Sequence, residues 1–256
     1  MRTHDLRSAC FLTLLLSHAG SAIAEGSSMC SVHSGATVPT VIELYTSEGC
    51  SSCPPADRWF SQLKSDTEVI GLAFHVDYWD GLGWKDRFAS STFTARQAQL
   101  QKRNNARYSY TPQILLNGVD YPRWRELRLP SSARTASTSA VQMTITRHGD
   151  SYAANVIALE GAPERLEAFW AMTEDGFTMS VGAGENRGAT LMHDFVVREY
   201  SPIAAWSSES LRQRTFNFSP QTRENPAHRR LVNLVIVDSK TGQPVQALRI
   251  GCRTGP

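Results

Sequence analysis

The chain has 256 residues, and its 26 Lys and Arg against 24 Asp and Glu give a net charge of +2 at pH 7 with neutral histidines. This near balance, without a basic patch, argues against a nucleic-acid partner and against binding to an anionic membrane surface. Hydrophobic residues make up 41% of the chain, which is ordinary for a globular protein of one large domain or two smaller ones.

Residues 1–24 have the pattern of a signal peptide. Arg2 and Arg7 precede a short apolar run over 9–16, and Ala22-Ile23-Ala24 places small residues where signal peptidase cleaves. The apolar run is far shorter than the roughly 20 residues that cross hydrocarbon, which argues against a membrane anchor. We therefore expect cleavage before Glu25, export to the periplasm or the medium, and no integral membrane segment in the mature protein.

Strand-like and helix-like patterns alternate between residues 25 and 130. β-Branched and aromatic runs predict strands, and apolar residues at helical spacing predict helices. The predicted elements are a strand over 38–46, a helix over 55–65, a strand over 69–76, a helix over 93–103 and a strand over 113–116. We interpret residues 25–130 as one α/β domain.

The composition changes near residue 130. Residues 131–140 are rich in Ser, Thr and Ala and are interpreted as a linker. Residues 141–256 then show mostly strand patterns, and turn signals at 148–150 and 240–242 predict two β-hairpins. The predicted strands cover 141–146, 152–159, 166–173, 195–200, 215–218, 231–237 and 244–250. We expect this part to be an all-β, antiparallel, sandwich-like domain.

The chemistry of the sequence is concentrated in two cysteines separated by two serines, Cys50-Ser51-Ser52-Cys53. The pair lies between a predicted strand and a predicted helix, where free backbone N–H groups and the positive helix end favour a thiolate. We expect Cys50 to be the nucleophile and Cys53, less exposed, to resolve the mixed disulfide. The pair predicts a thiol-disulfide oxidoreductase that acts on a protein or small thiol or disulfide substrate and needs no cofactor.

Two other interpretations of this pair stay open. A static disulfide would make the chain an envelope-binding protein whose β-rich part recognises the ligand. A Cu(I) chaperone would use Cys50, Cys53 and His75 as ligands, because soft thiolates select Cu(I). A tetrahedral zinc site is disfavoured because the sequence has no second closely spaced pair of cysteines.

Five segments of the sequence carry a family resemblance: 43–57, 75–80, 84–86, 108–118 and 182–194. They are similar, in this order, to segments of an exported bacterial thioredoxin-like family, domain of unknown function twelve twenty-three (DUF1223). The resemblance covers most of the mature chain. It implies a thioredoxin-like fold, a mixed sheet flanked by helices, for the first domain.

Thioredoxin-like proteins place a cis proline against the redox pair, and Thr111-Pro112 before the predicted strand over 113–116 resembles that element. A cis bond would turn the Thr111 backbone toward a partner peptide beside Cys50, so that Pro112 shapes the partner groove. The alternative is a trans proline that opens an edge strand.

Polar residues follow the second predicted strand and are expected near the cysteine pair. Asp77 or His75 is a candidate for proton transfer to or from Cys53. The alternative is that His75 is a strand residue with a satisfied hydrogen bond. Glu48, beside the pair, would instead raise the pKa of Cys50 by like charge.

Cys30 and Cys252 stand near the two ends of the mature chain. Four cysteines in an oxidising compartment favour a second disulfide between them, and the alternatives are free thiols or an extra resolving cysteine.

The glycine-rich stretch 182–188 is not a nucleotide-binding loop, because its spacing differs and no Gly-Lys-Ser follows. We expect it to be an ordinary loop of the β-rich part. His193 and Asp194 are expected to be turn residues, with metal or partner binding as the alternative.

Overall fold

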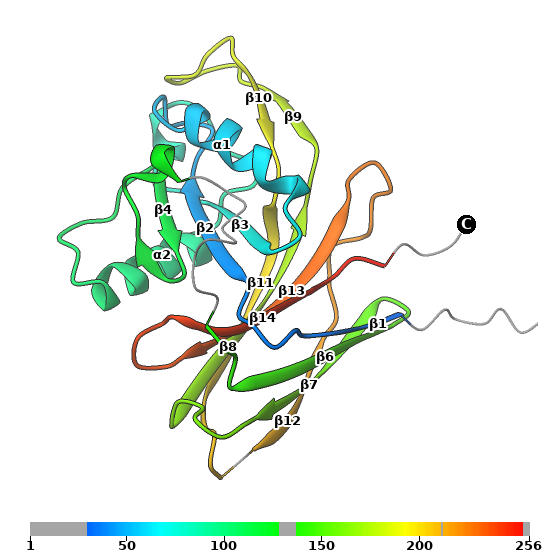
Figure 1. Ribbon diagram of the computed structural model, residues 1–256. Coiled ribbons are helices and arrows are strands. Elements are labelled where there is room, and N and C mark those ends of the chain that lie inside the picture. The colour runs from blue at the N-terminus through cyan, green and yellow to red at the C-terminus, as the bar shows by residue number, and fades with distance from the viewer. Residues whose placement is uncertain (1–29, 128–136, 211, 253–256) are drawn as a thin grey trace, which may run out of the picture.

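Strands dominate the structure (Figure 1). The computed structural model describes residues 30–127, 137–210 and 212–252, and these contain two α-helices, α1 (Pro54–Ser61) and α2 (Ser91–Arg103). The strands are β1 (Cys30–His33), β2 (Thr40–Thr46), β3 (Val69–His75), β4 (Gln113–Leu116), β5 (Val119–Asp120), β6 (Val141–His148), β7 (Ser151–Ala158), β8 (Arg165–Glu174), β9 (Phe177–Ser180), β10 (Thr190–His193), β11 (Val196–Ser207), β12 (Gln213–Phe218), β13 (Arg230–Asp238) and β14 (Pro244–Ile250). Three short 3-10 helices cover Gln62–Ser65, Asp80–Leu82 and Trp124–Glu126.

One large mixed sheet runs through both halves of the chain, in the order β14-β13-β8-β11-β3-β2-β4-β5. β2 and β3 are parallel and joined through α1, as the sequence pattern predicts. β11 pairs with β8 in antiparallel fashion and with β3 in parallel, where Val196 lies opposite Ala73. This pairing connects the strands of the second half directly to those of the first.

The predicted fold class, a helix-flanked thioredoxin-like domain followed by a separate all-β sandwich, is therefore wrong. The structure is mostly β-sheet, with one large mixed sheet and one antiparallel sheet. The physical reason lies in β3, whose seven residues are all buried. A fully buried strand must be covered at its edge and on both faces, and the sequence pattern does not say which segment covers it. Here β11 takes that place.

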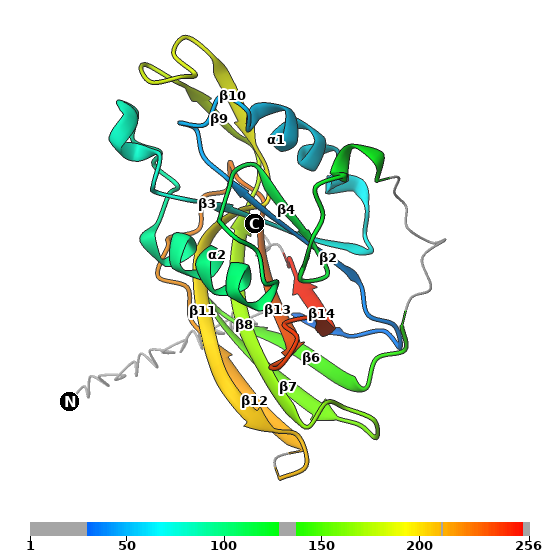
Figure 2. The ribbon, with the colours of Figure 1, turned by 90° about the vertical axis from the view of Figure 1, so that its left-hand side faces the viewer.

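The second sheet has the order β1-β6-β7-β12 and lies at the end of the molecule opposite α1 (Figure 2). Its alternating apolar residues pack against β8 and β13 of the large sheet. Trp170 of β8 is buried here and stacks on Phe218 of β12, with 5.5 Å between ring centroids. Both predicted hairpins are confirmed, because β6 pairs with β7 and β13 pairs with β14.

The two helices cover opposite faces of the β2–β3 part of the large sheet. Phe60 of α1 packs in the same cluster as Leu44, whereas Phe93 of α2 packs in the same cluster as Tyr45. Because neighbouring residues of a strand point to opposite faces, Leu44 and Tyr45 place the helices on different sides. The carboxyl ends of β2 and β3 are thus held by packing from both sides.

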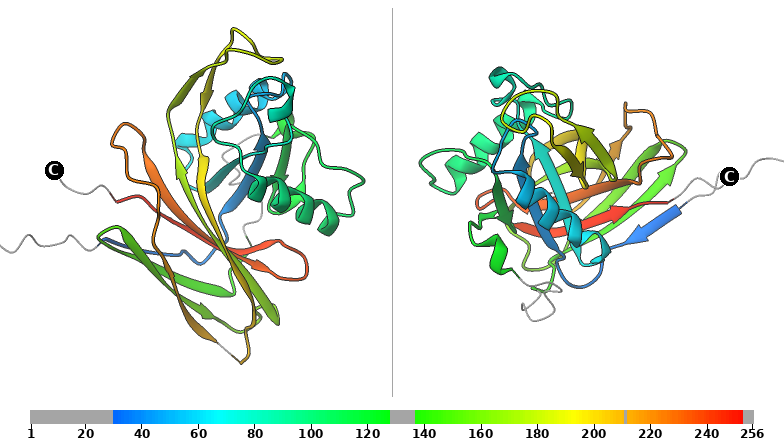
Figure 3. Two further views of the ribbon diagram at one scale, coloured as in Figure 1. Left: turned by 180° about the vertical axis from the view of Figure 1, so that it is seen from behind. Right: turned by 90° about the horizontal axis from the view of Figure 1, so that it is seen from above.

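A two-stranded arm, β9 and β10 with the loop between them, extends beyond the large sheet beside α1 (Figures 1 and 3). β9 follows β8 and β10 precedes β11, so the arm continues the antiparallel pair β8–β11. The sequence pattern predicted neither β9 nor β10, nor the short strands β1 and β5. The arm brings residues of the second half over the end of β2.

A disulfide joins Cys30 to Cys252, with 6.2 Å between the Cα atoms. It ties β1 to the segment after β14. The expected signal peptide, residues 1–24, and most of the expected linker, residues 131–140, lie outside the described residues. Within the described part of the chain, no helix has the length and apolar character that crossing a membrane requires.

Candidate functional site

The second disulfide joins Cys50 to Cys53, with 5.4 Å between the Cα atoms. It lies between the end of β2 and the start of α1, where Cys53 is the N-cap residue and Pro54 begins the helix. Proline is favoured in this first turn because its missing N–H would have no partner inside the helix. The local sequence therefore fixes the pair at the start of the helix.

Both cysteines are completely buried, whereas Ser51 and Ser52 between them are exposed. The expected difference in exposure between Cys50 and Cys53 is thus absent from the structure. The Ser52 hydroxyl lies 3.3 Å from Cys50 Sγ and 3.5 Å from the backbone oxygen of Thr111.

Thr111 is placed beside the pair by the loop that precedes β4. The Thr111–Pro112 peptide bond is cis. Trp79 Nε1 donates a hydrogen bond of 2.8 Å to Thr111 Oγ1. Trp79 also explains Gly49, since a Cβ at position 49 would lie 3.0 Å from Trp79 Cβ. Trp79 is therefore part of the wall of the site.

The loop of the β9–β10 arm covers the cysteine pair. Asn186 Nδ2 donates to the backbone oxygens of Glu48 and Cys50, at 2.8 and 3.0 Å. The Glu185 carboxylate accepts from the backbone N–H of Ser51 at 3.1 Å. We expected residues 182–188 to form an ordinary loop, so this contact with the cysteine pair was not predicted. The family resemblance of that segment was the only sequence signal for it.

Glu48 is buried just before the pair and is held from two directions. Trp84 Nε1 donates to Glu48 Oε2 at 2.7 Å, and the backbone N–H of Glu48 donates to Asp86 Oδ2 at 2.9 Å. The other carboxylate oxygen, Oε1, has no hydrogen-bond partner among the described residues. A buried carboxylate with an unpartnered oxygen is costly unless a positive charge lies close by.

His75 and Asp86 form a second buried pair beneath Glu48. His75 Nδ1 lies 2.6 Å from Asp86 Oδ2, and both side chains are fully buried. Burial raises the pKa of Asp86, but His75 and the backbone N–H groups of Glu48 and Phe88 outweigh this effect and lower it to about 2. Asp86 is therefore a carboxylate at neutral pH.

His193 of β10 lies between two carboxylates that flank the cysteine pair. Its Nε2 is 3.5 Å from Glu48 Oε1, and its Nδ1 is 3.7 Å from Asp57 Oδ1 on α1. Burial lowers the pKa of His193, but Asp57 and Glu48 outweigh this and raise it to about 9. His193 is thus a buried cation at neutral pH and not the turn residue that the sequence suggested.

Asp77 lies away from this group. Its carboxylate accepts a hydrogen bond from the Thr94 hydroxyl of α2, and its backbone N–H donates to the same hydroxyl. These contacts tie the end of β3 to the helix. The carboxylates that the structure brings beside the cysteine pair are the buried ones of Glu48 and Asp57 and the exposed one of Glu185.

The sequence matches the family described as Protein of unknown function (DUF1223) over residues 41–236. This range includes the cysteine pair, its buried neighbours and the arm. The chain belongs to the DUF1223 family. The family resemblance drawn from the sequence is thereby confirmed.

Two solved structures resemble this DUF1223 protein. A structural-genomics crystal structure of a protein from Agrobacterium tumefaciens is 26% identical, with a TM-score of 0.64, and the match covers 86% of this chain and 97% of that one. HBP35 of Porphyromonas gingivalis is 13% identical, with a TM-score of 0.54 and coverage of 85% and 76%. At that identity the similarity concerns the fold alone. No curated protein matches the chain.

The Cu(I) interpretation finds no support in this DUF1223 structure. Within residues 30–127, 137–210 and 212–252, no group of three or more His, Cys, Asp or Glu side chains is arranged to hold a metal ion. His75, the third ligand in that interpretation, is engaged by Asp86.

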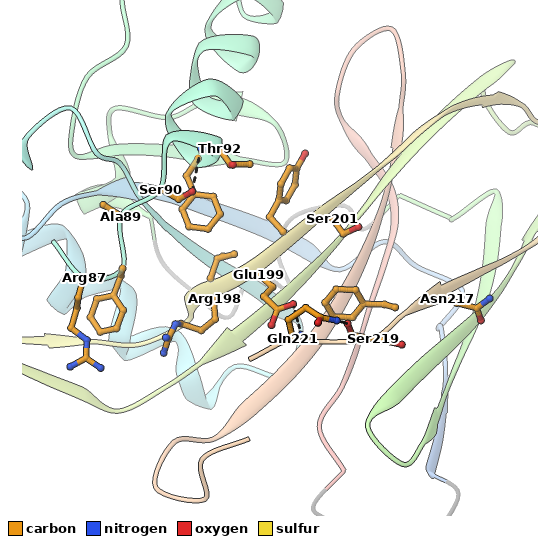
Figure 4. Close-up of a pocket in the computed structure, with 15 residues that line it drawn as sticks. Arg87, Ala89, Ser90, Thr92, Arg198, Glu199, Ser201, Asn217, Ser219 and Gln221 are labelled. Atoms are coloured by element: carbon orange, nitrogen blue, oxygen red, sulfur yellow. Dashed lines mark hydrogen bonds between the residues drawn. The ribbon is translucent and has the colours of Figure 1, made fainter. Parts of the chain in front are cut away.

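A cleft of about 570 Å³ lies elsewhere on the DUF1223 protein, between the start of α2 and strand β11 (Figure 4). Two of its three charged residues are engaged, because Arg198 pairs with Glu174 and Glu199 accepts from the backbone N–H groups of Gln221 and Thr222. The third, Arg87, lies over the ring of Phe88. Since these groups do not converge on the space of the cleft, the cysteine pair remains the better candidate site.

Proposed function

We propose that this protein is a thiol-disulfide oxidoreductase that uses Cys50 and Cys53 as a reversible couple. The observation that carries the proposal is the disulfide of closely spaced cysteines at the start of α1, flanked by buried charged groups. Perturbed titratable groups beside a nucleophile are typical of sites that do chemistry. A disulfide that only stabilised the fold would not need a buried cation and two carboxylates around it.

The exchange moves two electrons between the protein and its partner. In the oxidised form, a partner thiolate attacks Cys50 Sγ, a new S–S bond forms, and the Cys50–Cys53 bond breaks. Cys53 leaves as a thiolate and takes up a proton. A second partner thiolate then attacks the mixed disulfide and releases Cys50, so the partner is oxidised and the pair is reduced. The reverse sequence reduces a partner disulfide.

Thr111 and Pro112 would form the wall along which an extended partner lies. Ser52 contacts the Thr111 backbone oxygen, so a partner strand beside Thr111 would be close to Cys50. Main-chain pairing of this kind gives affinity with little demand on the partner's sequence. We assign no proton transfer to Asp77, because its carboxylate is engaged by Thr94.

We place this activity in the periplasm or outside the cell. Two disulfides, one of them between the ends of the described chain, support an oxidising compartment, since cytosolic thiols are kept reduced. The partner would be an exported protein or a small thiol or disulfide.

The proposal is tested by dithiothreitol-dependent reduction of insulin and by oxidation of a reduced peptide. We expect both activities in the native protein and their loss in Cys50→Ser. The matched control is the double variant Cys30→Ser/Cys252→Ser, which removes the other disulfide and should keep the activity. Equal activity in Cys50→Ser and the native protein would overturn the assignment.

One observation favours a second candidate, a binding protein with a structural disulfide: neither sulfur is exposed. The two candidates differ in the reduction potential of the pair against glutathione. A structural disulfide has a potential below about −300 mV, whereas a redox couple of the cell envelope lies well above this value.

A further inference from the structure

His193, on strand β10 of the arm, lies close to two carboxylates that flank the cysteine pair in the sequence. Glu48 lies two positions before Cys50, and Asp57 lies one helical turn after Cys53. His193 lies within ion-pair distance of both carboxylates, so its imidazole bridges the residues on the two sides of the cysteine pair. This residue comes from β10, far from the pair in the sequence.

Apart from these two carboxylates, few polar groups lie close to the ring nitrogens of His193. Both of its ring nitrogens lack a hydrogen-bond partner among the described residues, although the ring is buried. The His75 ring of β3 packs against it with 4.9 Å between centroids, and His75 itself is engaged by Asp86. On the other side the Phe88 ring adds no charge. The carboxylates nearest the ring nitrogens of His193 are therefore those of Glu48 and Asp57, with the His75–Asp86 pair behind the ring, and Arg58 of α1 lines the same cavity as His193.

A small cavity connects this group to the outside of the helix. It has a volume of about 100 Å³, lies between α1 and β10, and is lined by residues that include Pro54, Asp57 and His193. Asp57 and His193 thus border one common space beside α1. Among the described residues, neither nitrogen of His193 nor Oε1 of Glu48 has a hydrogen-bond partner. This indicates that electrostatic interactions, and not packing alone, account for these buried groups.

We propose that His193 is a positioning residue that regulates the cysteine pair: by offsetting the charges of Glu48 and Asp57, it allows the reduced Cys50 thiol to ionise at neutral pH. This inference rests on the proposed function. Ionisation of Cys50 releases a proton to solvent and leaves a thiolate. Two carboxylates beside the pair would oppose that step by like charge, and one imidazolium offsets much of their effect. The raised pKa of His193, about 9, is consistent with a cation there at neutral pH.

The test is the pH dependence of alkylation of reduced Cys50 by iodoacetamide, read by mass spectrometry of the Cys50 peptide. The thiolate is the reactive form, so the midpoint of the rate curve reports its pKa and the alkaline plateau reports access. In His193→Gln we expect the midpoint to rise by about one unit, which makes alkylation on the order of tenfold slower below the midpoint. The plateau should be unchanged.

The matched control is Met192→Gln, a neutral substitution at the neighbouring, exposed position of the same strand. It should leave the midpoint where it is. An unchanged midpoint in His193→Gln would overturn the proposal, and so would a change in the plateau alone, because it would show that His193 only holds the arm in place.

A second variant keeps the proposal testable if His193→Gln does not fold. Glu48→Gln removes one carboxylate, so the midpoint should fall, and an unchanged or higher midpoint would contradict the proposal. These outcomes are separate from the proposed function. Loss of the midpoint shift leaves the insulin assay untouched, whereas an active Cys50→Ser variant removes the function whatever His193 does.

Discussion

The buried charges around the cysteine pair make the stability of the protein depend on pH. Among these buried groups, His193 and Asp86 have the most clearly shifted pKa values. A histidine whose pKa is raised in the folded state stabilises that state fully below its unfolded pKa, near 6.5, and loses this effect as the pH rises through the folded value. Asp86, whose pKa is lowered, stabilises above about pH 4 and loses this effect as the pH falls through 2.

We therefore predict that the free energy of unfolding declines between pH 6.5 and pH 9, because over that range the histidine has lost its proton in the unfolded state but still holds it in the folded state. The decline attributable to this group is on the order of 3 kcal/mol. Urea denaturation at a series of pH values measures it. His193→Gln should flatten the curve over this range, and a decline of the same size in the variant would show that other groups cause it.

At the scale of single residues, the sequence identified the cysteine pair of the proposed site but not its surroundings. Cys50 and Cys53 were evident from their spacing, because two cysteines at the start of a helix have few other uses. His193 was not, since one histidine in a strand carries no signal of what it faces. Glu48 and Asp57 lie within the recognised segment, but their charge matters only through an imidazole that arrives from β10.

At the scale of elements, the contact between β3 and β11 depends on the absence of a side chain at Gly71. A Cβ at this position would lie 2.9 Å from the ring of Phe195, closer than real Cβ atoms come. The ring cannot move away easily, because it is buried against Phe60 of α1, with 5.0 Å between ring centroids. Gly71 is thus required where the second half joins the first.

We predict that Gly71→Ala lowers the free energy of unfolding by about 1 to 3 kcal/mol, the usual cost of forcing extra volume into a packed core. Urea denaturation is the measurement. The matched control is Gly81→Ala, because a Cβ there meets nothing within 4 Å. This control should change stability by less than about 0.5 kcal/mol. A Gly71→Ala variant as stable as the native protein would show that β11 and β3 can separate without cost.

The hydrogen bonds of Asn186, in the loop of the arm, lead to a prediction about access to the cysteine pair. Its side chain donates two hydrogen bonds to the backbone around Cys50, and each typically contributes about 1 kcal/mol. We predict that Asn186→Ala speeds reduction of the Cys50–Cys53 disulfide by dithiothreitol by up to roughly tenfold, because the open state of the loop becomes more populated.

The control for this experiment is Arg187→Ala, since Arg187 is the exposed neighbour in the same loop. Its rate of reduction should match that of the native protein. If Asn186→Ala and Arg187→Ala behave alike, the loop does not limit access to the pair.

The sequence pattern was sufficient for most of the elements. The runs over 113–116 and 244–250 coincide with β4 and β14, and both hairpins formed at their turn signals. The sequence pattern did not predict β9 and β10, which are short and have mixed polarity. Their pairing is fixed by the longer strands β8 and β11 that they continue, so no local pattern was needed to form them.

For the molecule as a whole, strand order decides the architecture, and strand order is not written in local periodicity. The parallel pairing of β11 with β3 joins two parts of the chain whose local patterns predict separate folds. Mostly buried strands such as β3 and β8 are typical of the centre of a sheet, but many other strands could pair with them. The fold class was therefore wrong although most of its elements were right.

The disulfide between Cys30 and Cys252 acts at this largest scale, because it closes a loop over a sequence separation of 222 residues. In the chain-entropy model, closing a loop of this length destabilises the unfolded state by about 5 kcal/mol. We predict that Cys30→Ser/Cys252→Ser lowers the free energy of unfolding by a few kcal/mol and lowers the melting temperature, measured by circular dichroism. The insulin activity at 25 °C should persist, because neither cysteine is part of the proposed exchange. A double variant with native stability would show that the packing of β1 on β6 and β14 holds the chain ends together without the bond.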